Sequence, residues 1–331
     1  MLQELNALPE GLLAMPASEL HRCLSGPTLI HLPGRVAEPL FVSVLLHGNE
    51  DTGWEAIRQL LQEYTGRELP RALSLLIGNT AAARVGQRHL PGQPDYNRIW
   101  NGGDGPEAEM ARCVVERMRE RRVFASIDLH NNTGLNPHYA CINRLEQPFL
   151  HLATLFSRTL VYFLRPEAVQ SMAFSQLCPA VTVECGKVGH LHGIEHARQF
   201  VAAALQLSQF PDHPLSPQDY DLYHTVATVR IPADLSFGFE CPESSLNLPA
   251  DLDHLNFTEL AAGTRLARVR DASIRLEVTD EQGNNVTDRY LLNDGEHLQT
   301  RLPVMPSMLT LDETVIRQDC LGYLMERLPP L

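Results

Sequence analysis

The stretch FVSVLLHGNE, residues Phe41 to Glu50, decides the fold of this chain. An apolar strand-like run ends in His47, Glu50 stands three residues further on, and a helix-like stretch begins at once at Asp51. This order is typical of an α/β sheet, in which functional side chains gather at the carboxyl ends of strands. His47 and Glu50 can both reach one point above such a sheet, as two ligands of a zinc ion must, and Gly48 allows the turn.

Alternating strand-like and helix-like segments continue around this stretch, from about Leu29 to Leu207. Short runs rich in Val, Leu and Ile are typical of buried strands, and longer stretches with apolar residues at helical spacing are typical of helices. We therefore expect an α/β fold whose central sheet is covered by helices on both faces. The expected strands are Phe41–Leu46, Leu73–Ile77, Val123–Leu129, Leu160–Phe163 and Ala180–Val183, and the expected helices are Asp51–Tyr64, Glu107–Arg121 and Gly193–Gln206.

The segment from Arg84 to Gly105 is dense in Gly, Pro and Asn, which predicts a long loop. Long loops in compact domains are often functional. After Phe210 a Pro- and Asp-rich segment, PDHPLSPQD, follows, and beyond it short segments alternate apolar and polar residues between turn signals. We expect an α/β domain over residues 1–211 and a smaller β-rich domain over 212–331, which covers or flanks the cleft. The expected strands of that domain are Thr225–Ile231, Arg265–Arg270, Ile274–Val278 and Arg289–Leu292.

The net charge of −13 excludes some classes of partner. Such a surplus of carboxylates disfavours binding to phosphate backbones or anionic membranes, so neither a nucleic-acid nor a membrane role is expected. An anionic substrate would need a local cluster of arginines. The seven cysteines show no metal-binding spacing and are interpreted as buried packing residues in a reducing compartment. The amino-terminal residues lack the pattern of a signal peptide and no long apolar run occurs, so we expect the cytoplasm.

A third metal ligand is expected at another strand end, because catalytic zinc commonly takes three protein ligands and a water molecule. His130 ends the strand-like run Val123–Leu129, and Asp128 on the same strand face could orient a ligand. Glu184 ends the apolar run AVTVE, and burying a carboxylate there is costly unless it serves a function. A carboxylate beside a metal can act as a general base toward the attacking water.

Four motifs occur in a fixed order: LLHGNE, then DYNRIW, then DLHNNTG, then TVECGK. As a set they resemble the succinylglutamate desuccinylase/aspartoacylase family, a branch of the zinc carboxypeptidase superfamily, over roughly residues 40 to 200. The resemblance implies a mixed, largely parallel central sheet and one zinc ion per chain. It implies that His47, Glu50 and His130 bind the zinc ion and that Glu184 is the base.

The same resemblance implies the roles of four further residues. Asn97 and Arg98 would bind a substrate carboxylate, Arg88 would polarise the scissile carbonyl and stabilise its oxyanion, and Asn131 would contact the substrate. Aspartoacylases carry another carboxylate-binding arginine shortly before the catalytic glutamate. The corresponding stretch SMAFSQLCPAV, which contains Phe174, has no arginine. A second acidic group is therefore either absent from the substrate or bound elsewhere, and the resemblance does not extend to N-acetylaspartate as the substrate.

Each of these residues could instead have a purely structural role. A single histidine at a strand end is more often a hydrogen-bonded structural residue than a ligand, and Glu184 could belong to a buried ion pair. Arg88 and Arg98 could fix the long loop. Among the other histidines, His190 and His192 resemble a metal pair but are expected to lie in a solvated turn; His89 and His138 have no spacing that argues for a site.

The sequence thus predicts zinc-dependent hydrolysis of the amide bond in an N-acyl amino acid or a related small N-acyl compound. A metallocarboxypeptidase that acts on peptides is one alternative, and a non-catalytic small-molecule-binding protein on the same fold is another. The acyl group, the amine and the formation of a homo-oligomer are left open.

Overall fold

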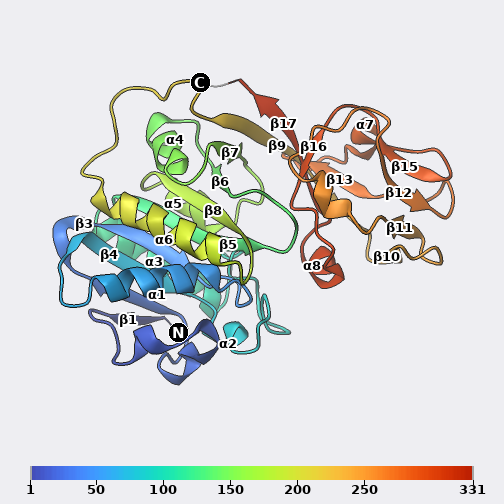
Figure 1. Cartoon of the computed structure of the whole chain (residues 1–331). Coiled ribbons are helices and arrows are strands. Elements are labelled where there is room, and N and C mark those ends of the chain that lie inside the picture. Colours follow the sequence, from blue (N-terminus) through green and yellow to red (C-terminus); the bar gives the residue numbers. More distant parts are fainter. Residues whose placement is uncertain (1, 330–331) are drawn as a thin grey trace. The chain divides into compact units, whose positions relative to one another are not determined.

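The sheet that carries the predicted ligands lies in the first of two units into which the chain divides. The structure is a computed structural model and describes residues 2–329 (Figure 1). The first unit comprises residues 2–131 and 138–221, and the second comprises 132–137 and 222–329.

Strands of the first unit follow the order β1-β2-β4-β3-β5-β8-β6-β7. The pairs β1–β2, β3–β4, β3–β5 and β6–β7 are parallel, whereas β2–β4 and β6–β8 are antiparallel. This mixed, largely parallel sheet is the expected fold class. The strands are β1 (Gln3–Leu5), β2 (Thr28–Leu32), β3 (Gly34–Val44), β4 (Leu69–Ile77), β5 (Ala125–Asn132), β6 (Tyr139–Ile142), β7 (Thr159–Tyr162) and β8 (Ala180–Lys187).

Strand β3 lies between β4 and β5, and its second half is closed off from solvent on both faces. Residues Leu40 to Val44 are fully buried. The ring of Phe41 stacks on that of Phe174, with centroids 4.3 Å apart. Burial on both faces explains why this stretch is a nearly continuous apolar run rather than an alternating one.

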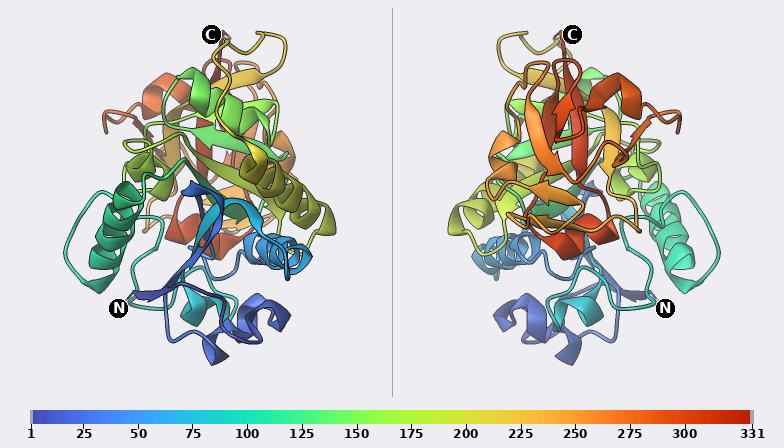
Figure 2. Two further views of the ribbon diagram at one scale, coloured as in Figure 1. Left: turned by 90° about the vertical axis from the view of Figure 1, so that its left-hand side faces the viewer. Right: turned by 90° about the vertical axis from the view of Figure 1, so that its right-hand side faces the viewer.

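Helices cover both faces of this sheet. Helices α1 (Thr52–Glu63) and α6 (Leu191–Gln206) pack against each other on one face (Figure 1). Helix α3 (Pro106–Glu120) lies on the opposite face (Figure 2). Within residues 2–329, none of the helices combines the length and apolar character needed to cross a bilayer. The shorter helices are α2 (Thr80–Ala83), α4 (Gln147–Thr154), α5 (Gln170–Phe174), η1 (Leu12–Ala14) and η2 (Ala17–Arg22).

The second unit is built from two groups of strands. Strand β9 (Asp221–Arg230) pairs with β17 (Gly322–Leu328) and with β13 (Glu277–Asp280), and β16 (Met305–Ser307) pairs with β17. A separate five-stranded sheet has the order β10-β11-β12-β15-β14. Its strands are β10 (Phe237–Phe239), β11 (Leu246–Leu248), β12 (Arg265–Val269), β14 (Leu291–Asn293) and β15 (His297–Thr300), and the helices of the unit are η3 (Leu252–Leu255), α7 (Thr287–Tyr290) and α8 (Glu313–Gln318).

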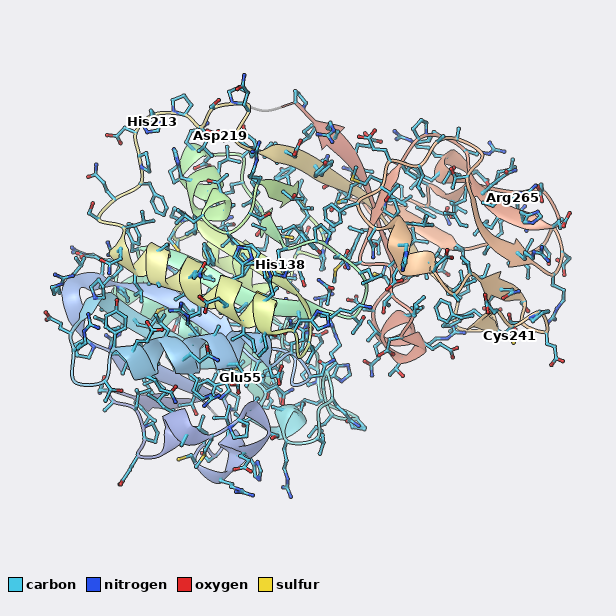
Figure 3. The ribbon with its side chains drawn as sticks, in the orientation of Figure 1. Glu55, His138, His213, Asp219, Cys241 and Arg265 are labelled. Carbon is cyan, nitrogen blue, oxygen red and sulfur yellow. The ribbon has the colours of Figure 1, made fainter. Side chains whose placement is uncertain are left out.

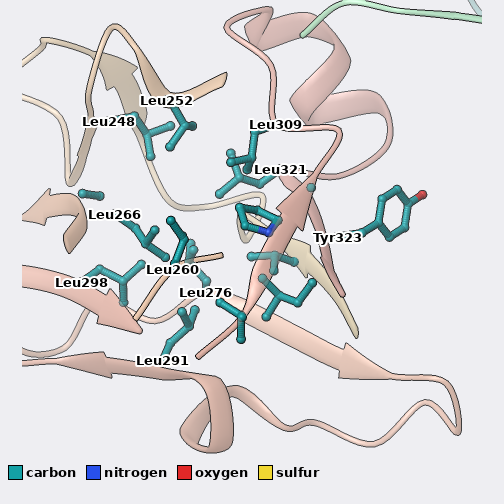
Figure 4. A pocket seen from close by; sticks show the side chains of 16 residues that line it. Leu248, Leu252, Leu260, Leu266, Leu276, Leu291, Leu298, Leu309, Leu321 and Tyr323 are labelled. Carbon is teal, nitrogen blue, oxygen red and sulfur yellow. The ribbon is translucent and has the colours of Figure 1, made fainter. Parts of the chain in front are cut away.

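Leucines dominate the core of the second unit, and a cavity of about 30 Å³ remains among them (Figure 4). Leu248, Leu276 and Leu298 are among the residues that line it. A cavity of this size and apolar character has room for about one water molecule and no polar partners to hold it, so it is a packing defect rather than a ligand site.

All seven cysteines are free thiols, as expected. Cys178, Cys185 and Cys320 are buried and Cys241 is exposed; Cys23, Cys113 and Cys141 are partly buried. The interpretation of all cysteines as buried packing residues is therefore wrong for Cys241 and holds only in part for the three partly buried ones. Burial, together with the neighbouring carboxylates of Glu184 and Glu50, raises the pKa of the Cys185 thiol well above its usual value.

Candidate metal centre

The turn between β3 and α1 is forced into one shape by its neighbours. Leu45 has a positive φ of 56°, and the amide of Gly48 donates to the carbonyl of Arg88 at 3.0 Å. A β-carbon added at Gly48 would lie 2.3 Å from the backbone nitrogen of Ala83 in α2. Only glycine fits this contact, so the turn fixes where His47 and Glu50 point.

The three predicted ligands come together at this point. Nδ1 of His47 lies 2.8 Å from Oε1 of Glu50, and Nδ1 of His130 lies 2.8 Å from Oε2 of the same carboxylate. All three residues are buried, and one ligand atom from each lies within 4.8 Å of the others. His47 and Glu50 follow β3 and His130 lies on the adjacent strand β5, which explains how residues 80 positions apart meet.

A carboxylate lies behind each imidazole. Nε2 of His47 is 3.0 Å from Oδ1 of Asp95, and Nε2 of His130 is 2.8 Å from Oδ2 of Asp128. Asp128 also accepts a hydrogen bond of 2.7 Å from the hydroxyl of Ser43. Metal-binding histidines usually donate their second N–H to such an acceptor, which leaves the other nitrogen free to bind the ion. Two imidazoles, one carboxylate and these supports therefore fit a divalent transition-metal ion.

Charges at the centre stabilise one another. Burial alone would raise the pKa of Glu50, but the adjacent His47 and His130 outweigh it and hold that pKa well below its usual range. Burial would lower the pKa of His130, but Asp128 and Glu50 raise it well above its usual value. Burial would likewise raise the pKa of Asp95, but His47, Arg88 and Arg98 outweigh it and hold that pKa well below its usual range. The carboxylates of Glu50 and Asp95 are therefore ionised and available to a cation or to its ligands.

Arg88 lies beside the metal ligands. Its Nε and Nη2 atoms bond to Oδ2 of Asp95 at 3.0 and 2.9 Å, and its Nη1 atom lies 3.9 Å from Oε1 of Glu50. Asp95 was not predicted as a site residue. Its only sequence signal is its place two residues before Asn97, in the loop that we expected to be functional.

Asn97 and Arg98 belong to the same loop, which the structure confirms as free of helix and strand from residue 84 to 105. Nδ2 of Asn97 lies 3.3 Å from Nε2 of His130, and its Oδ1 accepts from the backbone nitrogen of Gln170 at 2.9 Å. The guanidinium of Arg98 donates to the carbonyl of Asn97 at 3.0 Å. The loop therefore contacts the predicted ligands at more than one point: Asp95 lies against His47, and Asn97 lies against His130.

Asn131 uses its side chain to join two elements. Its Oδ1 accepts from the backbone nitrogen of Thr52 at 3.2 Å, and its Nδ2 donates to the carbonyl of Gly186 at 2.8 Å. Its backbone nitrogen donates to Oε2 of Glu50 at 3.1 Å. Asn131 thus positions a predicted metal ligand and links the start of α1 to the end of β8, while its contact with a substrate stays a prediction.

Glu184 lies in the second half of β8, the strand next to β5, and the residue is 8% exposed. Its backbone is opposite Tyr139 of β6. Phe174, near the place of the missing arginine, is fully buried and contacts Phe41 and Trp100, so it is a core residue. Neither His190 nor His192 belongs to the group of metal ligands.

Residues 38–210 match the model of the succinylglutamate desuccinylase/aspartoacylase catalytic domain. A curated succinylglutamate desuccinylase of Yersinia enterocolitica is 35% identical over 111 residues, which is 32% of this chain and 32% of that protein, so the match spans about a third of the relative.

Solved structures share the fold over most of their length. The succinylglutamate desuccinylase of Chromobacterium violaceum superposes with a TM-score of 0.58 at 20% identity, over 90% of this chain and 87% of the other. Murine aminoacylase 3 superposes with a TM-score of 0.61 at 17% identity, over 89% and 96% of the two chains. The catalytic-domain match contains His47, Glu50, His130 and Glu184.

Proposed function

Because the chain belongs to the succinylglutamate desuccinylase/aspartoacylase family, we propose that it is a zinc-dependent deacylase of small N-acyl compounds. The bond that it cleaves is the amide bond of an N-acyl amino acid or a close relative. The observation that carries this proposal is the meeting of two imidazole nitrogens on one buried carboxylate, with a further carboxylate behind each ring.

His47, Glu50 and His130 would hold the ion. When bound, zinc in a site of this kind polarises a carbonyl group and lowers the pKa of water, which supplies a nucleophile at neutral pH. The donor set supports this assignment, because catalytic zinc is commonly held by two histidines and one glutamate.

Glu184 is the proposed general base. It would take a proton from the attacking water and later donate it to the nitrogen of the leaving amine, so that each turnover returns the carboxylate to its starting state. A nearly buried carboxylate suits both roles, because exclusion of bulk water keeps the proton between the two reacting groups.

The loop residues would bind the substrate. The guanidinium of Arg88 would stabilise the negative charge that develops on the scissile carbonyl oxygen, and its bonds to Asp95 keep that guanidinium in place. Asn97 and Arg98 would hold the substrate carboxylate, since a guanidinium can form two parallel hydrogen bonds with it.

The substitution Glu184→Gln tests the assigned base. It removes proton transfer but retains size and hydrogen bonding, so kcat should fall by about 10²- to 10⁴-fold while the zinc content stays unchanged. Glu167→Gln, at an exposed position of the same unit, is the matched control and should retain full turnover. Turnover by Glu184→Gln at the wild-type rate would refute the base.

A substrate panel tests the reaction class. The zinc-loaded chain should be assayed with acetyl, succinyl and other N-acyl amino acids beside short unacylated peptides. Release of a free amine from at least one N-acyl amino acid, with slower cleavage of the peptides, is expected. Faster cleavage of peptides would replace the deacylase proposal by a carboxypeptidase.

A further inference from the structure

Three histidines that the proposed reaction does not use lie together in the first unit. His138 precedes β6 and lies alongside α6, whose first turns carry His192 and His196 (Figure 3). Nδ1 of His138 is 2.6 Å from Nδ1 of His196, and the ring centroids of His138 and His192 are 5.1 Å apart. We call these three residues the histidine cluster.

The helix places two members of the histidine cluster on one face. His192 and His196 are four residues apart within α6, and side chains at this spacing are neighbours on a helix surface. Two histidines four residues apart on a helix are the arrangement by which several zinc proteins bind their ion. The pairing that matters is therefore His192 with His196, and not His192 with His190.

Groups around the histidine cluster hold its rings in the way that metal-binding histidines are usually held. The ring of His196 also has a hydrogen bond to the backbone of Phe156, the kind of support that a metal-binding imidazole needs for its second nitrogen. Gly186 leaves space for His138, because a β-carbon there would lie 3.0 Å from its Nε2 atom. Residues from β8, α6 and the segment before β6 thus surround the histidine cluster.

At His138 and His196, protonation does not compete with a cation. Burial, then His196 and His192, lower the pKa of His138 to about 4, and burial lowers the pKa of His196 as well. Neutral imidazoles keep a lone pair for a metal ion at neutral pH. Glu195, between the two helix histidines, is engaged elsewhere, since Arg198 and Gln199 bind it and lower its pKa to about 2.

We propose that His138, His192 and His196 form a second site for a divalent transition-metal ion, which shares no ligand with the proposed catalytic centre. Three imidazoles without a carboxylate favour ions such as Zn²⁺, Ni²⁺ or Cu²⁺ over Ca²⁺ or Mg²⁺. An ion would replace the direct contact between His138 and His196, just as it would replace the contacts of Glu50 with His47 and His130.

Binding requires a small movement of His192. Among residues 2–329, only His47, Glu50 and His130 already present three ligand atoms within 4.8 Å of one another. His192 is exposed in the first turn of α6, so its ring can rotate toward the other two at little cost in packing.

Zinc titration of the full chain tests this proposal by calorimetry. The variant His47→Ala/His130→Ala, which lacks two ligands of the proposed catalytic centre, should still bind one equivalent of Zn²⁺. Adding His192→Ala should weaken this binding by at least about tenfold, because one ligand is lost. Adding His190→Ala instead, an exposed neighbour outside the cluster, should leave it unchanged.

A second measurement does not depend on the folding of that double variant. Wild-type chain saturated with Zn²⁺ should contain two equivalents by elemental analysis, and His192→Ala/His196→Ala should contain one. The proposal is overturned if the wild-type chain binds a single equivalent. It is also overturned if His190→Ala weakens binding as much as His192→Ala, which would indicate unspecific binding to surface histidines.

Discussion

Asp95 and Asp128 shape the candidate metal centre as much as the three predicted ligands do. Each carboxylate bonds to Nε2 of one histidine, and so keeps Nδ1 of that ring directed at Glu50. The two supports differ in setting, because Asp128 is fully buried on β5 whereas Asp95 lies in the long loop and also binds Arg88. The loop residue is therefore the better one to change without disturbing the sheet.

Asp95→Asn should lower the affinity for zinc by about 10- to 100-fold, because the neutral amide holds the imidazole of His47 less firmly. Competition with a chelator of known affinity measures the change. Asp104→Asn makes the same chemical change at an exposed position of the same loop and should have no effect. Equal affinities of Asp95→Asn and the wild-type chain would contradict a supporting role for Asp95.

The meeting of His47, Glu50 and His130 could be predicted from the sequence, but this support could not. Each of the three residues stands at the end of an apolar run, and strand ends on one edge of a sheet converge. Asp95 lies in a loop without regular structure, 48 residues from its partner His47. Its position depends on contacts between distant segments, which no local pattern encodes.

At the scale of elements, the turn after β3 connects the sheet to the candidate metal centre. Gly48 packs against α2, and the side chain of Asn79 caps that helix by accepting from the amide of Ala82. Any side chain at position 48 would have to displace backbone atoms of Ala82 and Ala83.

Gly48→Ala should therefore lower the free energy of unfolding by about 1–3 kcal/mol and weaken zinc binding. Denaturant titration measures the first effect. Gly26→Ala, where nothing lies within 4 Å of the added carbon, should stay within about 0.5 kcal/mol of the wild type. A Gly48→Ala variant as stable as Gly26→Ala would show that the turn tolerates displacement.

The long elements were predictable and the short ones were not. Helices α1, α3 and α6 agree with the expected ranges to within two residues, because an apolar face repeated over several turns is a strong signal. Strand β6 has four residues and follows a proline, so too few positions remain to show a pattern. Strand β3 begins at Gly34, seven residues before the expected start, because its first half alternates exposed and partly buried residues.

At the scale of the whole molecule, two cores stabilise the chain. The sheet of the first unit carries the candidate metal centre, and the leucine-rich core of the second unit contains the small cavity. The division into domains at residues 211 and 212 stays a prediction, and unfolding experiments on the full chain can test it.

Leu248→Ala enlarges the cavity of the second unit and should cost about 2–5 kcal/mol there. If the two units unfold separately, this variant lowers the midpoint of one unfolding transition, and added zinc raises the midpoint of the other. Leu311→Ala, at a position that is 39% exposed, should change neither transition by more than about 0.5 kcal/mol. A single transition that responds to both changes would show that the units unfold together.

Cys241 and Cys185 should react with thiol reagents at very different rates, because one is exposed and the other is buried. Cys241 is exposed, so a thiol-specific dye should attach there within the mixing period of the experiment. Cys185 is fully enclosed next to Glu184, and its raised pKa disfavours the reactive thiolate, so its modification must wait until β8 opens. The delay between the labelling of Cys241 and that of Cys185, followed separately for each labelled peptide, would record how often the centre of the first unit opens transiently.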